Sequence, residues 1–71
     1  MKFIDSFGNE VIEGSKIQII KAYKSTHWDG EEAYVIWDSK KGMYQYILFR
    51  DVNKSRRDFY DVHQFKVIDN E

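Results

Sequence analysis

The chain has 71 residues, no cysteine, and 11 basic against 12 acidic residues, which gives a formal net charge of −1. This length accommodates one domain with a thin core, and the lack of cysteine excludes disulfide bonds and thiolate chemistry. The charge balance excludes a general electrostatic attraction to nucleic acid, although a local basic patch remains open. The opening segment lacks the apolar run of a signal peptide, so we expect a cytoplasmic protein without membrane contact.

The kinds of apolar residue favour an all-β fold. The chain contains eight Ile, five Val and twelve aromatic residues, but one Leu and two Ala. Leu and Ala are strong helix formers, whereas β-branched and aromatic side chains suit a pleated, half-buried surface. This composition therefore predicts strands rather than helices.

Strand patterns recur along the chain and are separated by short polar stretches. Between the first two lies DSFGNEVIEG (residues 5–14), where Gly8 and Gly14 allow sharp bends while Val11 and Ile12 attach the excursion to the core. A loop with an Asp29-Gly30 turn follows the second pattern, and a charged loop covers residues 51–58. The five predicted strands are 2–4, 16–24, 32–38, 43–50 and 65–68.

The best-defined local feature is a hairpin over residues 32–50. The four-residue loop SKKG (39–42) joins its strands, and Gly42 can adopt the positive φ angle that hairpin loops need. This loop sets the pairs Trp37–Tyr44, Val35–Tyr46 and Ala33–Leu48. The opposite face then carries Tyr34, Ile36, Gln45, Ile47 and Phe49, so both faces are apolar.

The segment 59–64 has two interpretations. It is either part of a long strand or a helical turn over residues 61–64, capped by Asp61, before a strand at 65–68. We favour the turn, because the i, i+3 spacing of Val62 and Phe65 would bring both side chains onto the core. A longer helix over 53–64 is less favoured, because three basic residues would lie in its first turn.

An open sheet of five short strands leaves unpaired edges, and curling it into a small barrel removes them. We therefore predict a small five-stranded SH3-like barrel with one short helical turn near the C-terminus. In this arrangement, residues 5–14 carry the chain from one end of the barrel to the other.

The opening pattern is similar to that of known small barrels. An acidic residue, a glycine, an apolar residue, a second glycine and a strand residue follow one another as Asp5, Gly8, Val11 or Ile12, Gly14 and Ile17. This series resembles the start of SH3-like barrels and, in particular, of YopX-type proteins of bacteriophages and prophages. The resemblance implies a barrel fold and a phage or prophage origin; Ser15 stands where such proteins often have an acidic residue.

Two apolar faces on one hairpin suggest a surface for a partner. Curl of the sheet and neighbouring loops can cover the second face, or part of it stays exposed to contact another protein or a second copy. Trp28 is also a candidate, because it lies in a polar loop and either packs over the barrel end or contacts a partner. The candidate partner-binding residues are Trp28, Tyr34, Ile36, Tyr44 and Tyr46.

Nucleic-acid binding is the alternative. The segment NKSRR (53–57) is a compact basic loop, and small barrels bind single strands by combining such charge with stacking aromatics. Three aspartates flank this loop and reduce its field, so a solvated loop is the simpler interpretation. The residues for this alternative are Lys54, Arg56, Arg57, Lys21 and Lys24.

Catalysis has little support in the sequence. No phosphate-binding glycine loop and no nucleophile elbow is present. His27 beside Asp29, Glu31 and Glu32 is a weak metal pattern, because one histidine with flexible carboxylates is more often solvated. We therefore predict a non-enzymatic binding or accessory module with no metal and no cofactor.

Overall fold

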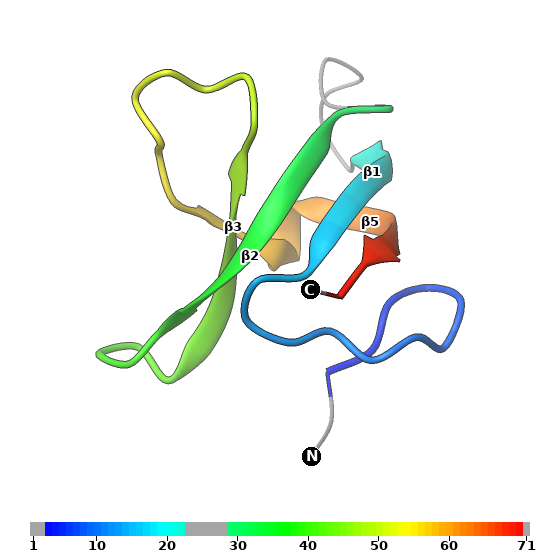
Figure 1. Ribbon diagram of the computed structural model, residues 1–71, viewed down its shortest axis with the longest axis horizontal. Coiled ribbons are helices and arrows are strands. Elements are labelled where there is room, and N and C mark those ends of the chain that lie inside the picture. Colours follow the sequence, from blue (N-terminus) through cyan, green and yellow to red (C-terminus); the bar gives the residue numbers. More distant parts are fainter. Residues whose placement is uncertain (1–2, 23–28, 71) are drawn as a thin grey trace.

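The computed structural model describes residues 3–22 and 29–70, and its strands form a single antiparallel sheet in the order β4-β3-β2-β1-β5 (Figure 1). The all-β prediction is therefore confirmed. The 3₁₀ helix η2 (Phe59–Asp61) is a single turn before the last strand. The strands are β1 (Lys16–Ala22), β2 (Glu32–Asp38), β3 (Met43–Leu48), β4 (Arg57–Asp58) and β5 (Val62–Asp69).

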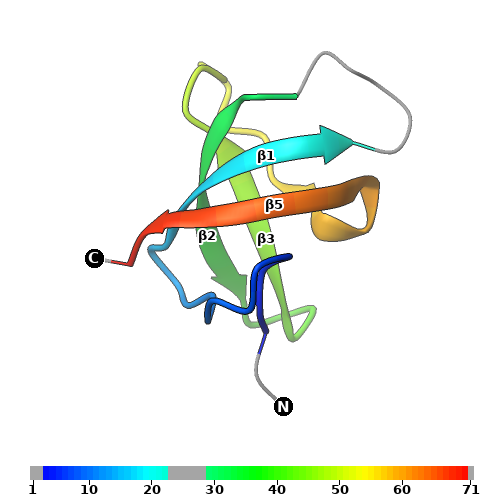
Figure 2. The same ribbon diagram turned by 90° about the vertical axis from the view of Figure 1, so that its right-hand side faces the viewer.

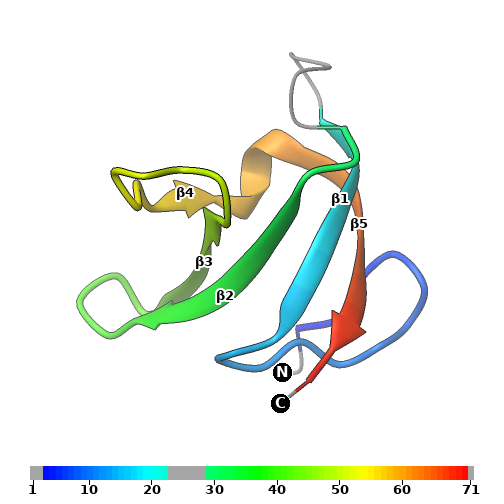
Figure 3. The same cartoon turned by 45° about the horizontal axis from the view of Figure 1, so that its top comes forward.

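The sheet curls strongly but does not close into a barrel (Figure 3). β4 and β5 are its two edges, and they do not pair within the described part of the chain. β4 pairs with β3 only through Gln45↔Asp58 and Tyr46↔Arg57, after which the chain leaves the sheet to form η2. We expected the sheet to close into a barrel because unpaired edges are unfavourable. Closure would require the free edge of β4 to pair with β5, and a strand of two residues offers too little backbone for that.

The predicted hairpin is confirmed in its register. β2 and β3 pair through Ala33↔Leu48, Val35↔Tyr46 and Trp37↔Tyr44, and Gly42 has a φ angle of 65°. The chain crosses between the strands through residues 39–42, as the four-residue loop requires. These pairings fix which hairpin residues share each face.

The strand predictions at the two ends of the chain are partly wrong. Residues 3 and 4 form no strand; Ile4 makes only an isolated bridge with Glu10, because the chain turns back at Gly8 and pairs with itself. Residue 2 lies outside the described residues, as do residues 23 and 24 of the predicted second strand. The fifth strand is instead β4, within the segment expected to be a loop.

The C-terminal turn forms, but two residues earlier than predicted. It occupies Phe59–Asp61, its N-cap is Asp58 rather than Asp61, and β5 starts at Val62. Val62 and Phe65 are both buried, as expected, although they lie on a strand. An irregularity in the pairing of β1 with β5 explains this difference. Lys21 pairs with Gln64, and the next β1 residue, Ala22, pairs with Val62, so β5 contains one extra residue at this point. The extra residue shifts the alternation of side chains along β5, and Val62 and Phe65 therefore reach the same side of the sheet.

The core fills the concave side of the sheet. The partly buried Phe3, Tyr44, Phe59 and Val67 pack against it. Val11 is part of the core, whereas Ile12 is exposed, so only Val11 anchors the segment 5–14 to the core. The buried core residues are Val11, Ile17, Ile19, Ala33, Val35, Tyr46, Leu48, Val62 and Phe65.

Aromatic rings fill the space between the two ends of the curled sheet. Phe3 lies edge-on to Phe59 with ring centroids 5.0 Å apart, and it stacks on Tyr44 of β3 at 5.5 Å. Phe59 in turn contacts Tyr46 of β3 and Phe65 of β5, each at 4.9 Å. We call these five rings the aromatic seam, because they join β3 to β5 where backbone hydrogen bonds do not.

The N-terminal segment (residues 3–15) covers the outer edge of β5 (Figure 2). The Phe65 N–H donates to Ser6 Oγ at 3.1 Å, and the Val67 N–H donates to Asp5 Oδ2 at 2.8 Å. The Ser6 N–H donates to the Phe65 carbonyl at 3.1 Å. Side chains and backbone of this segment thus bond to an edge that would otherwise offer unpaired groups to another chain.

Candidate protein-binding surface

The outer, convex side of the β2–β3 hairpin carries a second set of apolar side chains. The register places Tyr34 opposite Ile47, and Ile36 opposite Gln45, with side chains directed away from the core face. Phe49 follows β3 at its end and its backbone N–H donates to the Glu32 carbonyl at 3.0 Å. We call Tyr34, Ile36, Ile47 and Phe49 the outer patch.

Contacts within the outer patch hold its rings in place. The Tyr34 and Phe49 rings are tilted at 49° to each other with centroids 5.3 Å apart. The Lys16 ammonium lies 5.4 Å from the centroid of Phe49, a cation–π distance. Phe49 nevertheless keeps 53% of its surface exposed, while Ile47 is the buried member of the patch. A ring that is fixed and still exposed can contact a partner at little entropic cost.

Charged and polar pairs flank the outer patch. Asp38 ends β2 and Glu32 begins it, so each is two residues from a patch residue on the same strand face. A mostly apolar centre with a polar rim is the usual composition of a protein–protein contact surface. The flanking pairs are Lys16–Glu32 at 3.3 Å, Arg56–Asp38 at 3.6 Å and Gln45 Nε2–Asp58 Oδ1 at 2.6 Å.

Asp38 is held in its ionised form. The Lys41 backbone N–H lowers the pKa of Asp38 most, burial opposes this, and the Lys40 N–H and the charges of Arg56 and Lys41 lower the pKa further. Both N–H groups donate to Asp38 Oδ1, at 2.9 Å from Lys40 and 3.1 Å from Lys41. This carboxylate therefore orders the hairpin loop and pairs with Arg56 on its other oxygen.

The structure divides the predicted partner-binding residues. Tyr34 and Ile36 belong to the outer patch and are half-buried. Tyr44 is half-buried in the aromatic seam, and Tyr46 is fully buried in the core. The expectation of an exposed Tyr46 is therefore wrong, because its hairpin face is the one that turns inward. Trp28 lies outside the described residues.

Four exposed aromatic residues in the described part of the chain were not among the predicted ones: Phe7, Trp37, Phe49 and Tyr60. Two of them, Trp37 and Phe49, belong to the hairpin segment. Phe49 was placed on the outer hairpin face by the register but was not chosen as a contact residue. Trp37 is on the inner face, yet it is 44% exposed because it lies at the end of β2, edge-on to Tyr44 at 4.9 Å. The sequence feature that could have indicated the exposure of Phe49 and Trp37 is their position near a strand end, where neighbouring strands no longer cover the side chain.

The basic residues proposed for nucleic acid do not form one surface. Arg56 pairs with Asp38, and Arg57 pairs with Asp51 at 3.6 Å. Lys54 is exposed in the loop before β4, whereas Lys21 is on β1, with β2 and β3 between these two strands. Lys24 lies outside the described residues.

Among residues 3–22 and 29–70, no three His, Asp or Glu side chains are grouped so that they could hold a metal ion, and His27 lies outside these ranges. The helical part of the described chain is too short to cross a bilayer. The fold and surface define a small all-β domain, and no family model, no curated protein and no solved structure matches the chain.

Proposed function

We propose that this chain is a non-enzymatic module of SH3-like architecture that binds another protein through its outer patch. A five-stranded, strongly curled antiparallel sheet with a helical turn just before the last strand supports the architecture. The likeness of Asp5, Gly8, Gly14 and Ile17 to the opening of YopX-type proteins supports a phage or prophage origin.

The observation that carries this proposal is Phe49. This residue is 53% exposed, its ring contacts the Tyr34 ring and Lys16, and it lies on the face that the core does not use. Burying the exposed part of a phenylalanine in an interface contributes about 1–2 kcal/mol by the area rule. Aromatic anchors of this kind dominate the energetics of many interfaces.

The test compares two exposed aromatic residues. Phe49→Ser removes the anchor of the outer patch, while Tyr60→Ser removes a 73% exposed ring on η2, away from the patch. Proteins captured from the source cell by the immobilised chain are identified, and the purified partner is then titrated against each variant. We expect Phe49→Ser to weaken binding about tenfold or more, and Tyr60→Ser to leave it unchanged.

Stability separates a binding role from a folding role. If the outer patch serves binding, Phe49→Ser lowers the free energy of unfolding by less than about 1 kcal/mol, as surface substitutions do. A partner held equally well by wild type and Phe49→Ser contradicts the proposal. Light scattering over a range of concentrations, on the same variants, shows whether the partner is a second copy of the chain.

Binding to single-stranded nucleic acid is the second candidate from the sequence, through Lys54, Arg56, Arg57, Lys21 and Lys24. It has less support, because Asp38 and Asp51 already pair with the two arginines.

A further inference from the structure

The inner face of the hairpin ends in an exposed tryptophan. Trp37 is the last residue but one of β2, and 44% of its surface is exposed. Its ring meets Tyr44 edge-to-face, with centroids 4.9 Å apart and planes at 69°, and Tyr44 in turn stacks on Phe3 of the aromatic seam. An edge-to-face neighbour covers at most one face of the indole. Trp37 is therefore a ring that is held in place and keeps a face free of Tyr44, at the far end of the hairpin from Phe49.

A carboxylate is fixed at the backbone of the same residue. The Gly14 N–H donates to the Val35 carbonyl at 2.8 Å and the Val35 N–H donates to the Ser15 carbonyl at 2.9 Å, so the chain lies alongside β2 just before β1 begins. Gly14, with a φ angle of 92°, turns the chain away from β2 at this point. The Glu13 side chain reaches β2 where the backbone leaves it, and its Oε2 accepts the Trp37 N–H at 3.2 Å.

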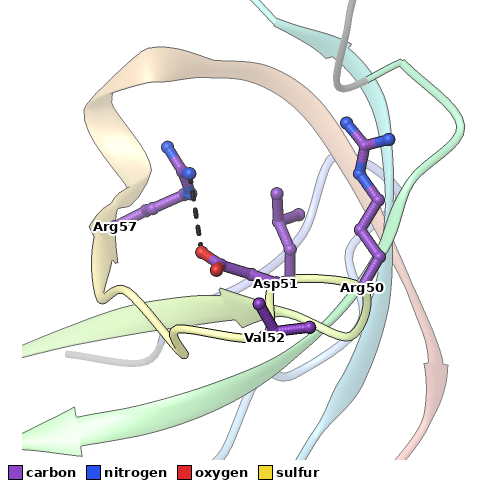
Figure 4. A pocket seen from close by; sticks show the side chains of 5 residues that line it. Arg50, Asp51, Val52 and Arg57 are labelled. Carbon is purple, nitrogen blue, oxygen red and sulfur yellow. Dashed lines mark ion pairs between the residues drawn. The ribbon is translucent and has the colours of Figure 1, made fainter.

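The Glu13 carboxylate has no cation beside it. Four other carboxylates are paired with Lys or Arg, as Asp51 is with Arg57 (Figure 4). Among residues 3–22 and 29–70, Glu13 takes part in no ion pair. The Trp37 N–H occupies one of about four acceptor positions of this carboxylate. Glu13 thus keeps its charge and its second oxygen for a cation from outside the described residues.

Two other exposed rings of this chain already have a cation. The Lys16 ammonium lies 5.4 Å from the centroid of Phe49, and the Lys66 ammonium lies 5.9 Å from that of Phe7. Within the described ranges, no lysine or arginine lies over Trp37 in this way. Indole is nevertheless the aromatic side chain that attracts cations most strongly. The open ring and the unpaired carboxylate therefore favour the same kind of ligand.

We propose that Trp37 and Glu13 form a contact site for an arginine side chain of a partner protein. The guanidinium lies flat on the indole and donates to Glu13 Oε1. Arginine fits better than lysine, because a planar guanidinium stacks on a ring while its N–H groups still point at a carboxylate, and because it is more weakly hydrated than an ammonium. The site shares no residue with the outer patch and does not depend on that proposal.

The first experiment is a titration followed by the backbone and indole N–H signals of the ¹⁵N-labelled protein at constant ionic strength. The probe is arginine blocked as its N-acetyl methylamide, which lacks the charges of the free amino acid. The blocked citrulline compound is its neutral isostere, and the blocked lysine compound tests an ammonium. We expect saturable shifts at the Trp37 indole and the Glu13 amide, with a Kd of about 10 mM for arginine. Citrulline should bind at least about fivefold more weakly, because it lacks the charge.

Variants assign the binding to the ring and the carboxylate. Glu13→Gln removes the charge but keeps an acceptor for the Trp37 N–H, and Trp37→Leu removes the ring. We expect each to weaken binding of blocked arginine about fivefold or more. Glu10→Gln removes an exposed charge from the same segment and should leave binding unchanged. Because Trp37 also packs on Tyr44, the exposed Glu13 is the position that decides if Trp37→Leu perturbs the fold.

Four results would each overturn the proposal. These are equal binding of blocked citrulline, equal or tighter binding of blocked lysine, unchanged binding in Glu13→Gln, and tighter binding of free arginine than of the blocked compound, which would identify a small metabolite as the ligand. Phe49→Ser should bind blocked arginine as the wild type does. A failure of this site therefore leaves the outer patch untouched, and a failure of the outer patch leaves this site untouched.

Discussion

Asp5 connects the start of the chain to its last strand. Its side chain is buried and accepts four hydrogen bonds. Oδ1 takes the N–H groups of Phe7 and Asn9, both at 2.8 Å. Oδ2 takes the Asn9 side-chain amide at 3.0 Å and the Val67 N–H at 2.8 Å. The Asp5 carboxylate thus stabilises the turn around Gly8 and also accepts a hydrogen bond from β5.

Replacing this carboxylate by an amide should destabilise the protein. Asp5→Asn keeps the shape but puts an NH₂ group against N–H donors that then lack an acceptor. We expect the free energy of unfolding to fall by about 2 kcal/mol, the typical cost of losing charged, buried hydrogen bonds. Urea denaturation measures this, with Glu10→Gln as a control in the same segment, where the side chain is exposed. Equal midpoints for the two variants would contradict this role.

The ionisation of Asp5 also predicts how stability depends on pH. Burial raises the pKa of Asp5, but the hydrogen bonds from Val67, Asn9 and Phe7 together hold it below its ordinary value of 3.8. The folded state therefore gains stability above the unfolded pKa, and loses it as the pH falls through the lower folded pKa. Between about pH 5 and pH 2, stability should fall more steeply for wild type than for Asp5→Asn. Thermal melts over this pH range measure the effect, and parallel stability profiles for wild type and Asp5→Asn would contradict this role of the Asp5 carboxylate.

The aromatic seam replaces strand pairing as the connection between the sheet ends. Phe3 contributes to it from outside the sheet, and contacts Tyr44, Phe59 and Phe65. Its neighbour Phe7 is 62% exposed and contacts only the Lys66 ammonium, at 5.9 Å, among the ring contacts in the described residues. The two phenylalanines thus have different roles although they lie four residues apart.

These two residues form a matched pair for mutation. Phe3→Ala removes three ring contacts and opens a cavity in the seam, so we expect a loss of about 2–3 kcal/mol in unfolding free energy. Phe7→Ala should cost less than about 1 kcal/mol, as for an exposed ring. Chemical denaturation of both variants measures the difference. Equal losses would show that the seam does not hold the sheet ends together.

The hairpin and the chain ends differ in how well the sequence predicts them. Pairs such as Val35–Tyr46 follow from a local loop and an alternating pattern, so sequence alone predicts them. The conformation of residues 3–6 depends on Phe65 and Val67, sixty residues away, and no local pattern contains that information. Likewise, the sequence alone does not assign Tyr46 to the inner face of the hairpin, because both hairpin faces are apolar. The face that becomes buried is the one that packs against residues of β1 and β5. Phe49 could have been chosen, since its face followed from the register.

At the scale of the whole molecule, paired charges weaken the case for nucleic acid. The formal net charge is −1, and two of the three arginines, Arg56 and Arg57, pair with aspartates. We expect a labelled single-stranded oligonucleotide to bind with a Kd weaker than about 100 µM at about 150 mM salt. Fluorescence anisotropy measures this. Asp38→Asn releases Arg56 and should strengthen binding at low salt; tight wild-type binding with a steep salt dependence would instead favour the nucleic-acid alternative.

The bonds from Ser6 to Phe65 and from Asp5 to Val67 span 59 and 62 positions of the chain. The hairpin depends on residues that are near one another in the sequence, but Phe3 and Asp5 depend on partners at the other end of the chain. A truncated chain that ends before Phe65 should therefore be readily digested by proteases at its N-terminal segment, whereas a chain that includes Val67 should resist digestion there.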